Sequence, residues 1–175
     1  MSTWQFDTAH SSISFRVRHM MFAKVRGHFG KWQGSLEATP GQLGAAKAHV
    51  TIEASSIDTG IADRDNHLRS ADFLDTATFP SITFTSTGVK VAGDALTITG
   101  DLTIRDVTRS IVLTGDYSGE GKDPWGNVRL GFSAHTKLSR KDFGLVWNQL
   151  LETGGAIVGD EIEVDLEVEV QRPAA

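Results

Sequence analysis

Strict alternation of apolar and polar residues constrains the fold of this chain more than any other feature. It is clearest in residues 161–170, EIEVDLEVEV, where five apolar side chains alternate with five carboxylates. Successive side chains of a β-strand point to opposite faces, so this segment is predicted to be a strand with one apolar and one acidic face. A helix would distribute the same residues around all of its sides, which argues against a helical segment here.

The same period of two recurs along most of the chain. It appears near residues 13–17, 48–53, 82–84, 96–104, 111–117 and 128–138, and turn sequences such as TPGQLG, AGD and VGDE separate the segments. Because each strand is apolar on one face only, the pattern predicts an antiparallel sheet with a solvated side. Counting residues 24–38 as one strand gives about eight strands, and Gly27, Gly30 and Gly34 predict bulges or a tight bend within it.

Two segments interrupt the alternation, residues 60–76 and 140–155. In the first, Thr59 is expected to cap a helix with a narrow apolar stripe, formed by Ile61, Leu68 and Ala71. The segment is otherwise charged and is interpreted as a cover with an apolar underside. The predicted fold is therefore all-β, an antiparallel eight-stranded barrel with two short helical or loop insertions, in a single domain over residues 1–175.

The distribution of charge predicts how the barrel closes. Residues 8–36 contain no acidic side chain but include Arg16 and Arg18, whereas the last strand has an acidic face. The first and last strands of a closed up-and-down barrel are neighbours, and opposite charges across such a pair stabilise it by roughly 0.2–1 kcal/mol each. We therefore expect Arg16 and Arg18 beside Glu163, Asp165 or Glu167; the alternative is a basic patch for a phosphate or a lipid headgroup.

Composition excludes several classes of function. The net charge of −5 disfavours nucleic-acid binding, and the absence of cysteine excludes disulfides, thiolate nucleophiles and zinc–thiolate sites. The first residues, MSTWQFDTAH, do not resemble a secretory signal. No apolar run approaches the roughly 18 residues needed to cross a bilayer. We expect a soluble, cytoplasmic protein without stable membrane insertion.

Three clusters of polar residues were candidates for chemistry. Asp63, Asp65 and His67 lack a second histidine at a ligand spacing, and Asp65 points away from the other two on a helix, so a solvated pair or cap is favoured over a metal site. Asp7, His10 and Ser11 have the residue types of a catalytic triad, but hydrogen bonds to backbone at the start of the first strand are the favoured interpretation. Arg140 and Asp142 fit an ion pair or a ligand clamp equally well.

We therefore predict no catalytic residue and no bound metal, and keep two alternatives. One is a lipid hydrolase that uses Asp7 and His10. The other is a scaffold with a solid core, because an eight-stranded barrel is just wide enough either to be filled by side chains or to hold one small ligand.

Six segments, in their order along the chain, resemble one known family. They are WQFDTAHSSISFRVRH, VRGHFGKWQG, RDNHLRSADFLD, FPSITFTS, GDLTIRDVTRSIVL and RLGFSAHTKLSRKDFGLVWN. Together they are similar to the YceI-like family of polyisoprenoid-binding, lipocalin-like proteins over essentially the whole chain. The resemblance implies an extended barrel whose apolar tunnel holds a polyprenyl chain or an isoprenoid quinone. It further implies no enzymatic activity, no cofactor other than the lipid, and a homodimer; some family members are periplasmic, unlike the location expected here.

The resemblance and the strand alternation together select candidate ligand-binding residues. Those expected to face the tunnel from strands are Phe15, Val17, Ile52, Phe84, Leu102, Ile104, Phe132 and Leu138. Those expected on the covering segments are Phe22, Leu68, Phe73, Leu74, Phe143 and Trp147. The polar end of the lipid is expected to meet His10, Arg64, Arg140 or Asp142.

Overall fold

The structure is a computed structural model that describes residues 1–20, 22–149 and 157–174. The strands are β1 (Ser2–Phe6), β2 (Ser12–His19), β3 (Ala23–Phe29), β4 (Trp32–Ala38), β5 (Lys47–Glu53), β6 (Ile57–Asp58), β7 (Ser81–Ala92), β8 (Ala95–Ile104), β9 (Val107–Lys122), β10 (Val128–Ser139) and β11 (Val158–Arg172). The helices are α1 (Ala62–Arg69) and the short 3₁₀ turns η1 (Leu43–Ala45), η2 (Ala54–Ser56) and η3 (Arg140–Phe143).

The strands form one antiparallel sheet that closes into a barrel of eight staves. β1 and β2 pair one after the other with the same edge of β11, and they pair on their other side with β4 and β3. β1 and β2 therefore lie end to end as one of the eight staves, the units that span the barrel wall, and β4 and β3 lie end to end as another. The other six staves are the single strands β5 and β7 to β11. The expected all-β, antiparallel, eight-stranded barrel is confirmed.

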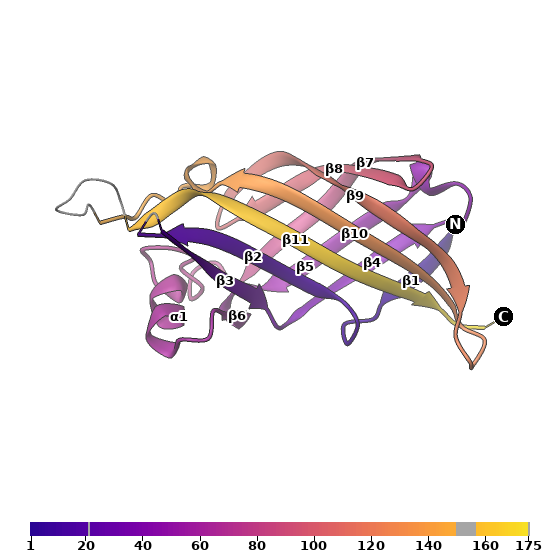
Figure 1. Ribbon diagram of the computed structural model, residues 1–175, viewed down its shortest axis with the longest axis horizontal. Coiled ribbons are helices and arrows are strands. Elements are labelled where there is room, and N and C mark those ends of the chain that lie inside the picture. The colour runs from indigo at the N-terminus through magenta and orange to yellow at the C-terminus, as the bar shows by residue number, and fades with distance from the viewer. Residues whose placement is uncertain (21, 150–156, 175) are drawn as a thin grey trace.

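The barrel is elongated, and its two ends differ (Figure 1). The long strands β8 to β11 run obliquely along it, α1 lies beside β3 and β6 at one end, and both chain termini lie at the other. Among the described residues, no helix is both long enough and apolar enough to cross a bilayer.

The predicted contact between the first and last staves is confirmed for Arg16. The register of β2 on β11 sets Arg16 opposite Glu163. Its Nη2 atom lies 3.0 Å from a carboxylate oxygen of Glu163 and 2.9 Å from one of Asp165. Arg18 forms no ion pair with any residue that the structure describes, because β11 bulges between Val158 and Ile162, beside Arg18.

Two of the three glycines expected to bend the chain make room for aromatic rings instead. A Cβ atom on Gly27 would lie 2.4 Å from Cζ of Phe15, and one on Gly34 would lie 2.9 Å from Cε2 of Phe6. Both distances are too short for real atoms, so each glycine allows a ring to approach the backbone of the neighbouring strand. The break between β3 and β4 falls at Gly30 and Lys31.

The two insertions lie where the sequence predicts them. In the first, α1 begins after Ile61, so the prediction that Thr59 caps it is wrong: the Thr59 amide donates to the Asp65 carboxylate at 2.9 Å. Ile61 and Ala71 are exposed, so Leu68 alone of the predicted apolar stripe turns inward. The second insertion begins with η3, and its residues 150–155 lie outside the described residues.

Candidate functional site

A cavity of about 360 Å³ occupies the half of the barrel nearer α1. It exists because the inward faces of the strands carry branched aliphatic and aromatic side chains that meet around it without filling it. The apolar strand residues on this lining are Phe6, Ile13, Phe15, Val17, Val25, Phe29, Trp32, Val50, Ile52, Ile57, Ile82, Phe84, Leu102, Ile104, Ile111, Leu113, Leu138, Val158, Ile162, Val164, Leu166 and Val168.

The cavity is long in the direction of the strands. Four successive inward-facing residues of β11, from Ile162 to Val168, lie on its lining. At about 3.3 Å per residue these positions span roughly 20 Å. The cavity is therefore an elongated apolar channel and not a compact pocket.

The half of the barrel nearer the termini is solid. Trp4, Leu130 and Val170 are almost completely buried there and pack in one cluster with Leu36 and Val128. The indole Nε1 of Trp4 donates to the Ala38 carbonyl at 3.1 Å, which satisfies the polar atom of that side chain inside the core. This cluster closes the inner end of the channel, so the scaffold alternative with a wholly solid core does not fit the interior.

The segment that follows β6 covers the other end of the channel. Leu68 on α1 and Phe73 and Leu74 after it all lie on the lining. The His67 ring stands edge-on to both Phe73 and Trp147, with ring centroids 5.1 and 4.6 Å apart. This segment is therefore a cover with an apolar underside, as the sequence predicts.

The candidate metal ligands on α1 do not converge. The His67 Nε2 atom lies 2.8 Å from a carboxylate oxygen of Asp72, and the buried Asp65 accepts hydrogen bonds from Thr59. Asp63 is exposed and faces solvent. Asp65 and His67 therefore hold the cover together, and the three residues do not form a shared site.

Arg140 fixes the second covering segment. Its side chain is almost fully buried, and its guanidinium donates to the carbonyls of Leu145 at 2.6 Å, Trp147 at 2.8 Å and Gly159 at 2.9 Å. Burial lowers the pKa of Arg140 below its usual value, and nearby Asp160 opposes that effect. Arg140 thereby joins the start of β11 to the segment after η3, which crosses the end of the channel.

The charged side chains on the lining are cationic. They are Arg18, Arg64 and Arg140. His19 and His67 also lie on the lining, and no carboxylate of a described residue belongs to it. The Arg64 guanidinium donates twice to Thr59, through Nε to the hydroxyl and through Nη2 to the carbonyl, each at 2.7 Å. The Arg18 side chain is exposed and forms no ion pair with the described part of the chain, so it is available for a polar or anionic group.

Comparison with known proteins places this barrel in a family. The family model described as "YceI-like domain" matches residues 4–170. The chain belongs to the YceI-like family. It is 46% identical to "Protein YceI" of Escherichia coli O157:H7 over 136 residues, which cover 78% of this chain and 71% of that protein.

Solved structures of two other proteins share the YceI-like barrel. The crystal structure of BcnA of Burkholderia cenocepacia has a TM-score of 0.81 at 23% identity and covers 94% of this chain and 98% of that one. A structure titled a polyisoprenoid binding domain from Saccharophagus degradans has a TM-score of 0.70 at 16% identity and covers 97% and 98%. At these identities the two structures support the fold alone.

The structure brings most of the predicted ligand-binding residues of this YceI-like barrel to one channel. Eleven of the fourteen apolar candidates lie on its lining: Phe15, Val17, Ile52, Leu68, Phe73, Leu74, Phe84, Leu102, Ile104, Leu138 and Trp147. Their placement follows from strand alternation, and their contact with a ligand stays a prediction.

Three apolar candidates lie elsewhere. Phe22 is 93% exposed because it sits in the turn between β2 and β3. Phe132 faces inward but packs against Tyr117 beyond the closed end of the channel, with ring centroids 5.3 Å apart. Phe143 is buried in the core around the channel, behind the residues that line it.

The four polar candidates divide in two. Arg64 and Arg140 lie on the lining, whereas Asp142 is exposed on η3. His10 is exposed at the turn between β1 and β2, beside the end of β11 that is remote from η3. His10 and Asp142 are therefore apart from each other and from the channel. The hydrolase alternative rests on Asp7 and His10, which pair at 2.8 Å, but neither of them lines the channel.

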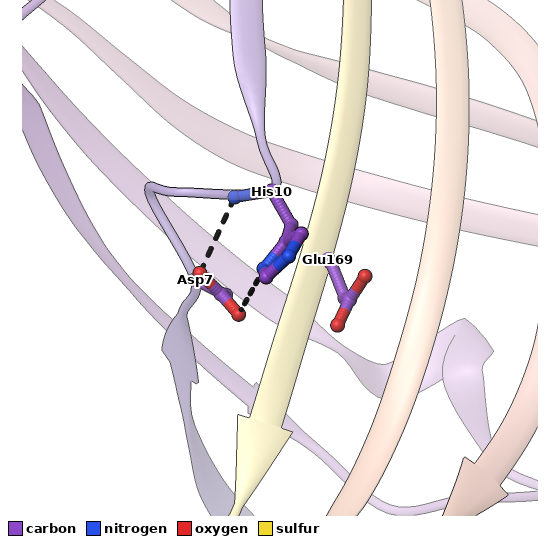
Figure 2. A group of neighbouring side chains, drawn as sticks. All are labelled: Asp7, His10 and Glu169. Atoms are coloured by element: carbon purple, nitrogen blue, oxygen red, sulfur yellow. Dashed lines mark hydrogen bonds and ion pairs between the residues drawn. The ribbon is translucent and has the colours of Figure 1, made fainter. Parts of the chain in front are cut away.

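The turn that holds His10 contains a cluster of ionisable groups (Figure 2). Asp7, His10 and Glu169 bring one potential ligand atom each within 4.8 Å of one another. The Asp7 carboxylate accepts from the backbone amides of Ala9 at 3.1 Å and His10 at 3.3 Å, which confirms its predicted role at the start of the stave. The His10 ring pairs with Asp7 at 2.8 Å, as Figure 2 shows.

Arg129 already pairs with the carboxylates of this cluster. Its Nη1 atom lies 2.8 Å from Asp7 and also contacts Glu169, and its Nε atom lies 3.1 Å from Asp123. The hydrogen bond from Arg129, followed by that from His10, lowers the pKa of Asp7 to about 2. A cation would have to displace the guanidinium, so the cluster is a structural clamp between the β1–β2 turn and the β9–β10 turn.

Sequence reasoning missed part of the lining although the signal was present. The alternation of β11 marks Ile162, Val164, Leu166 and Val168 as one face, and that face turns out to be a wall of the channel. No sequence pattern indicates that Arg18 lies exposed on the lining, because its exposure results from the bulge in β11.

Proposed function

We propose that this protein binds one long-chain isoprenoid lipid, a polyprenyl chain or an isoprenoid quinone, in the channel and thereby sequesters or carries it. The observation that carries the proposal is the roughly 20 Å run of apolar lining along β11, which suits an extended chain better than a compact ligand. Membership of the YceI-like family and a fold shared with a structure titled a polyisoprenoid binding domain support it.

Burial of apolar surface would supply the affinity. Each CH₂ group removed from water contributes about 0.8 kcal/mol, so a five-carbon isoprene unit contributes roughly 4 kcal/mol before the cost of ordering the chain is subtracted. The lining donates few hydrogen bonds, so binding would depend on the length and width of the chain. A polar end would lie near Arg18 and Arg64, the cationic groups at the covered end of the channel.

Extraction of the freshly purified, undenatured protein with organic solvent, followed by mass spectrometry, tests the proposal. We expect a prenyl or quinone species close to one per chain. Val164→Trp, which projects a large side chain from the lining, should reduce the extracted lipid several-fold. Glu167→Trp is the matched control, because it adds the same side chain at an exposed position of the same strand.

The proposal fails if reconstitution with a polyprenol or a quinone gives no stoichiometric complex. It also fails if Val164→Trp and Glu167→Trp retain equal amounts of lipid while both stay folded.

A further inference from the structure

Exposed apolar side chains gather at the covered end of the channel. Phe22 is 93% exposed and Met20 43% exposed, both in the turn between β2 and β3. The Met20 amide donates to the carbonyl of Ile157 at 2.7 Å, and the Ile157 amide donates to Gln149 at 3.0 Å. Val146, which is 63% exposed, lies a few residues along that same segment.

These residues border the channel. Arg18 and His19, which precede the β2–β3 turn, lie on the lining, and so does Ile157. Leu145 and Trp147 on either side of Val146 also lie on it. The lining and the exposed apolar residues are therefore consecutive along the same segments, with alternate side chains turned inward and outward.

The hairpin that carries Phe22 is cationic although the whole chain has a net charge of −5. Residues 16–26 contain three arginines, one lysine and no acidic residue. Arg16 and Lys24 pair with Glu163. Arg18 and Arg26 form no ion pair with residues of the described ranges, and both are exposed.

We propose that this end of the barrel docks on an anionic lipid surface, with Met20, Phe22 and Val146 inserted among the headgroups and Arg18 and Arg26 against them. We call these five residues the docking rim. The inference rests on the proposed function, since an isoprenoid lipid resides in membranes and must pass between them and the channel. Exposed apolar side chains with cationic neighbours are the combination that holds a protein at a membrane interface.

A lipid surface fits the docking rim better than a second copy of this chain does. Two rims brought together would place unpaired arginines of each copy near those of the other, and like charges oppose association. Anionic headgroups instead attract the arginines.

Sedimentation with vesicles of phosphatidylcholine and phosphatidylglycerol tests the inference on the full chain. Phe22→Ser should lower the vesicle-bound to free ratio about tenfold, because one aromatic side chain no longer leaves water. Arg26→Gln should lower it on these vesicles but not on phosphatidylcholine alone, and binding should weaken as salt is added.

Trp125→Ser is the matched control. Trp125 is 78% exposed in the turn between β9 and β10, and that turn lies beside the C-terminal residues, at the opposite end of β11. Its replacement should leave vesicle binding unchanged. Equal losses in Phe22→Ser and Trp125→Ser would overturn the docking rim.

Two further readouts separate this inference from the proposed function. Lipid extraction from each variant should give the wild-type amount, since Phe22 does not line the channel. A wild-type protein that holds lipid but does not sediment with either kind of vesicle overturns docking and leaves the proposed function standing. A change from dimer to monomer in Phe22→Ser, without a change in vesicle binding, overturns docking in favour of a second copy.

Discussion

The buried guanidinium of Arg140 donates a hydrogen bond to the backbone carbonyl of Trp147 at 2.8 Å. Through this bond η3, which directly follows β10, holds the chain that crosses the end of the channel. Arg140 reaches the carbonyls of Leu145 and Gly159 as well, so one side chain joins η3, the crossing segment and the start of β11. The position of Trp147 against His67 therefore depends on a side chain that binds the backbone of Trp147.

Replacing Arg140 by Met should lower the free energy of unfolding by about 3 kcal/mol, because several buried carbonyls lose their donor. For a domain of this size that corresponds to a fall of roughly 6–12 °C in Tm. Thermal unfolding followed by circular dichroism measures the change. Lys141→Met is the control, because Lys141 is exposed and should contribute less than about 1 kcal/mol. Equal melting temperatures for the two variants would contradict the role of Arg140.

Replacing Gly27 by Ala should destabilise the barrel by about 1–3 kcal/mol, because the new methyl group would collide with the Phe15 ring. The ring would be pushed toward the channel. Phe15→Leu should relieve the collision, so the double variant should lose less than the sum of the two single losses. Gly30→Ala is the control, since nothing lies within 4 Å of a Cβ atom there. Urea denaturation of the four proteins gives the coupling, and purely additive losses would refute this packing relationship.

The barrel could be predicted from the sequence because alternation is a local signal that repeats in every strand. The pairing of Arg16 with Glu163 was also within reach, since it requires only that the first and last staves be neighbours. Other features depend on registers that no local pattern encodes. The bulge in β11 exposes Arg18, and the end of the channel falls between Val168 and Phe132, although both face inward.

Helix-capping rules failed at Thr59 for a related reason. A threonine before a helix is ordinarily expected to accept a hydrogen bond from the first turn. Here the buried carboxylate of Asp65 accepts from Thr59, and Arg64 donates to the Thr59 hydroxyl and carbonyl. The buried carboxylate of Asp65 needs hydrogen-bond donors, and this need determines the geometry at Thr59. The burial of Asp65 cannot be read from the sequence.

Stability should fall in acid partly through Asp7. Its pKa is about 2 in the folded protein, below the ordinary value of 3.8, because Arg129 and then His10 donate hydrogen bonds to its carboxylate. A depressed folded-state pKa stabilises the protein above the unfolded value, and that contribution disappears as the pH falls from about 4 to 2. Urea denaturation across this range should show a shallower loss in Asp7→Asn than in the wild type. Asp116→Asn, at an exposed position, controls for removing one carboxylate. If the free energy of unfolding fell equally steeply with pH in Asp7→Asn and in the wild type, Asp7 would be excluded as a source of the acid sensitivity.

Exchange of a bound lipid should be limited by the segment that covers the channel. Leu68 and Phe73 face the channel from this cover, and Phe73 also packs against Trp147 with ring centroids 5.3 Å apart. Truncating both to Ala removes apolar contacts that hold the cover down, so the cover should open more often and release of the lipid should accelerate about tenfold or more. Stopped-flow transfer of a fluorescent prenyl analogue to vesicles measures that rate.

Ile61→Ala supplies the control for this experiment, because Ile61 precedes the same helix but is 53% exposed and does not line the channel. It should leave the release rate within a factor of two or so of the wild type, in keeping with the small effects of surface substitutions. A release rate in the Leu68→Ala, Phe73→Ala variant equal to that of Ile61→Ala would mean that lipid leaves by a path the cover does not control. Two strands of the barrel wall would then have to separate, and the bulged contact between β2 and β11 is one place where the ladder is already interrupted.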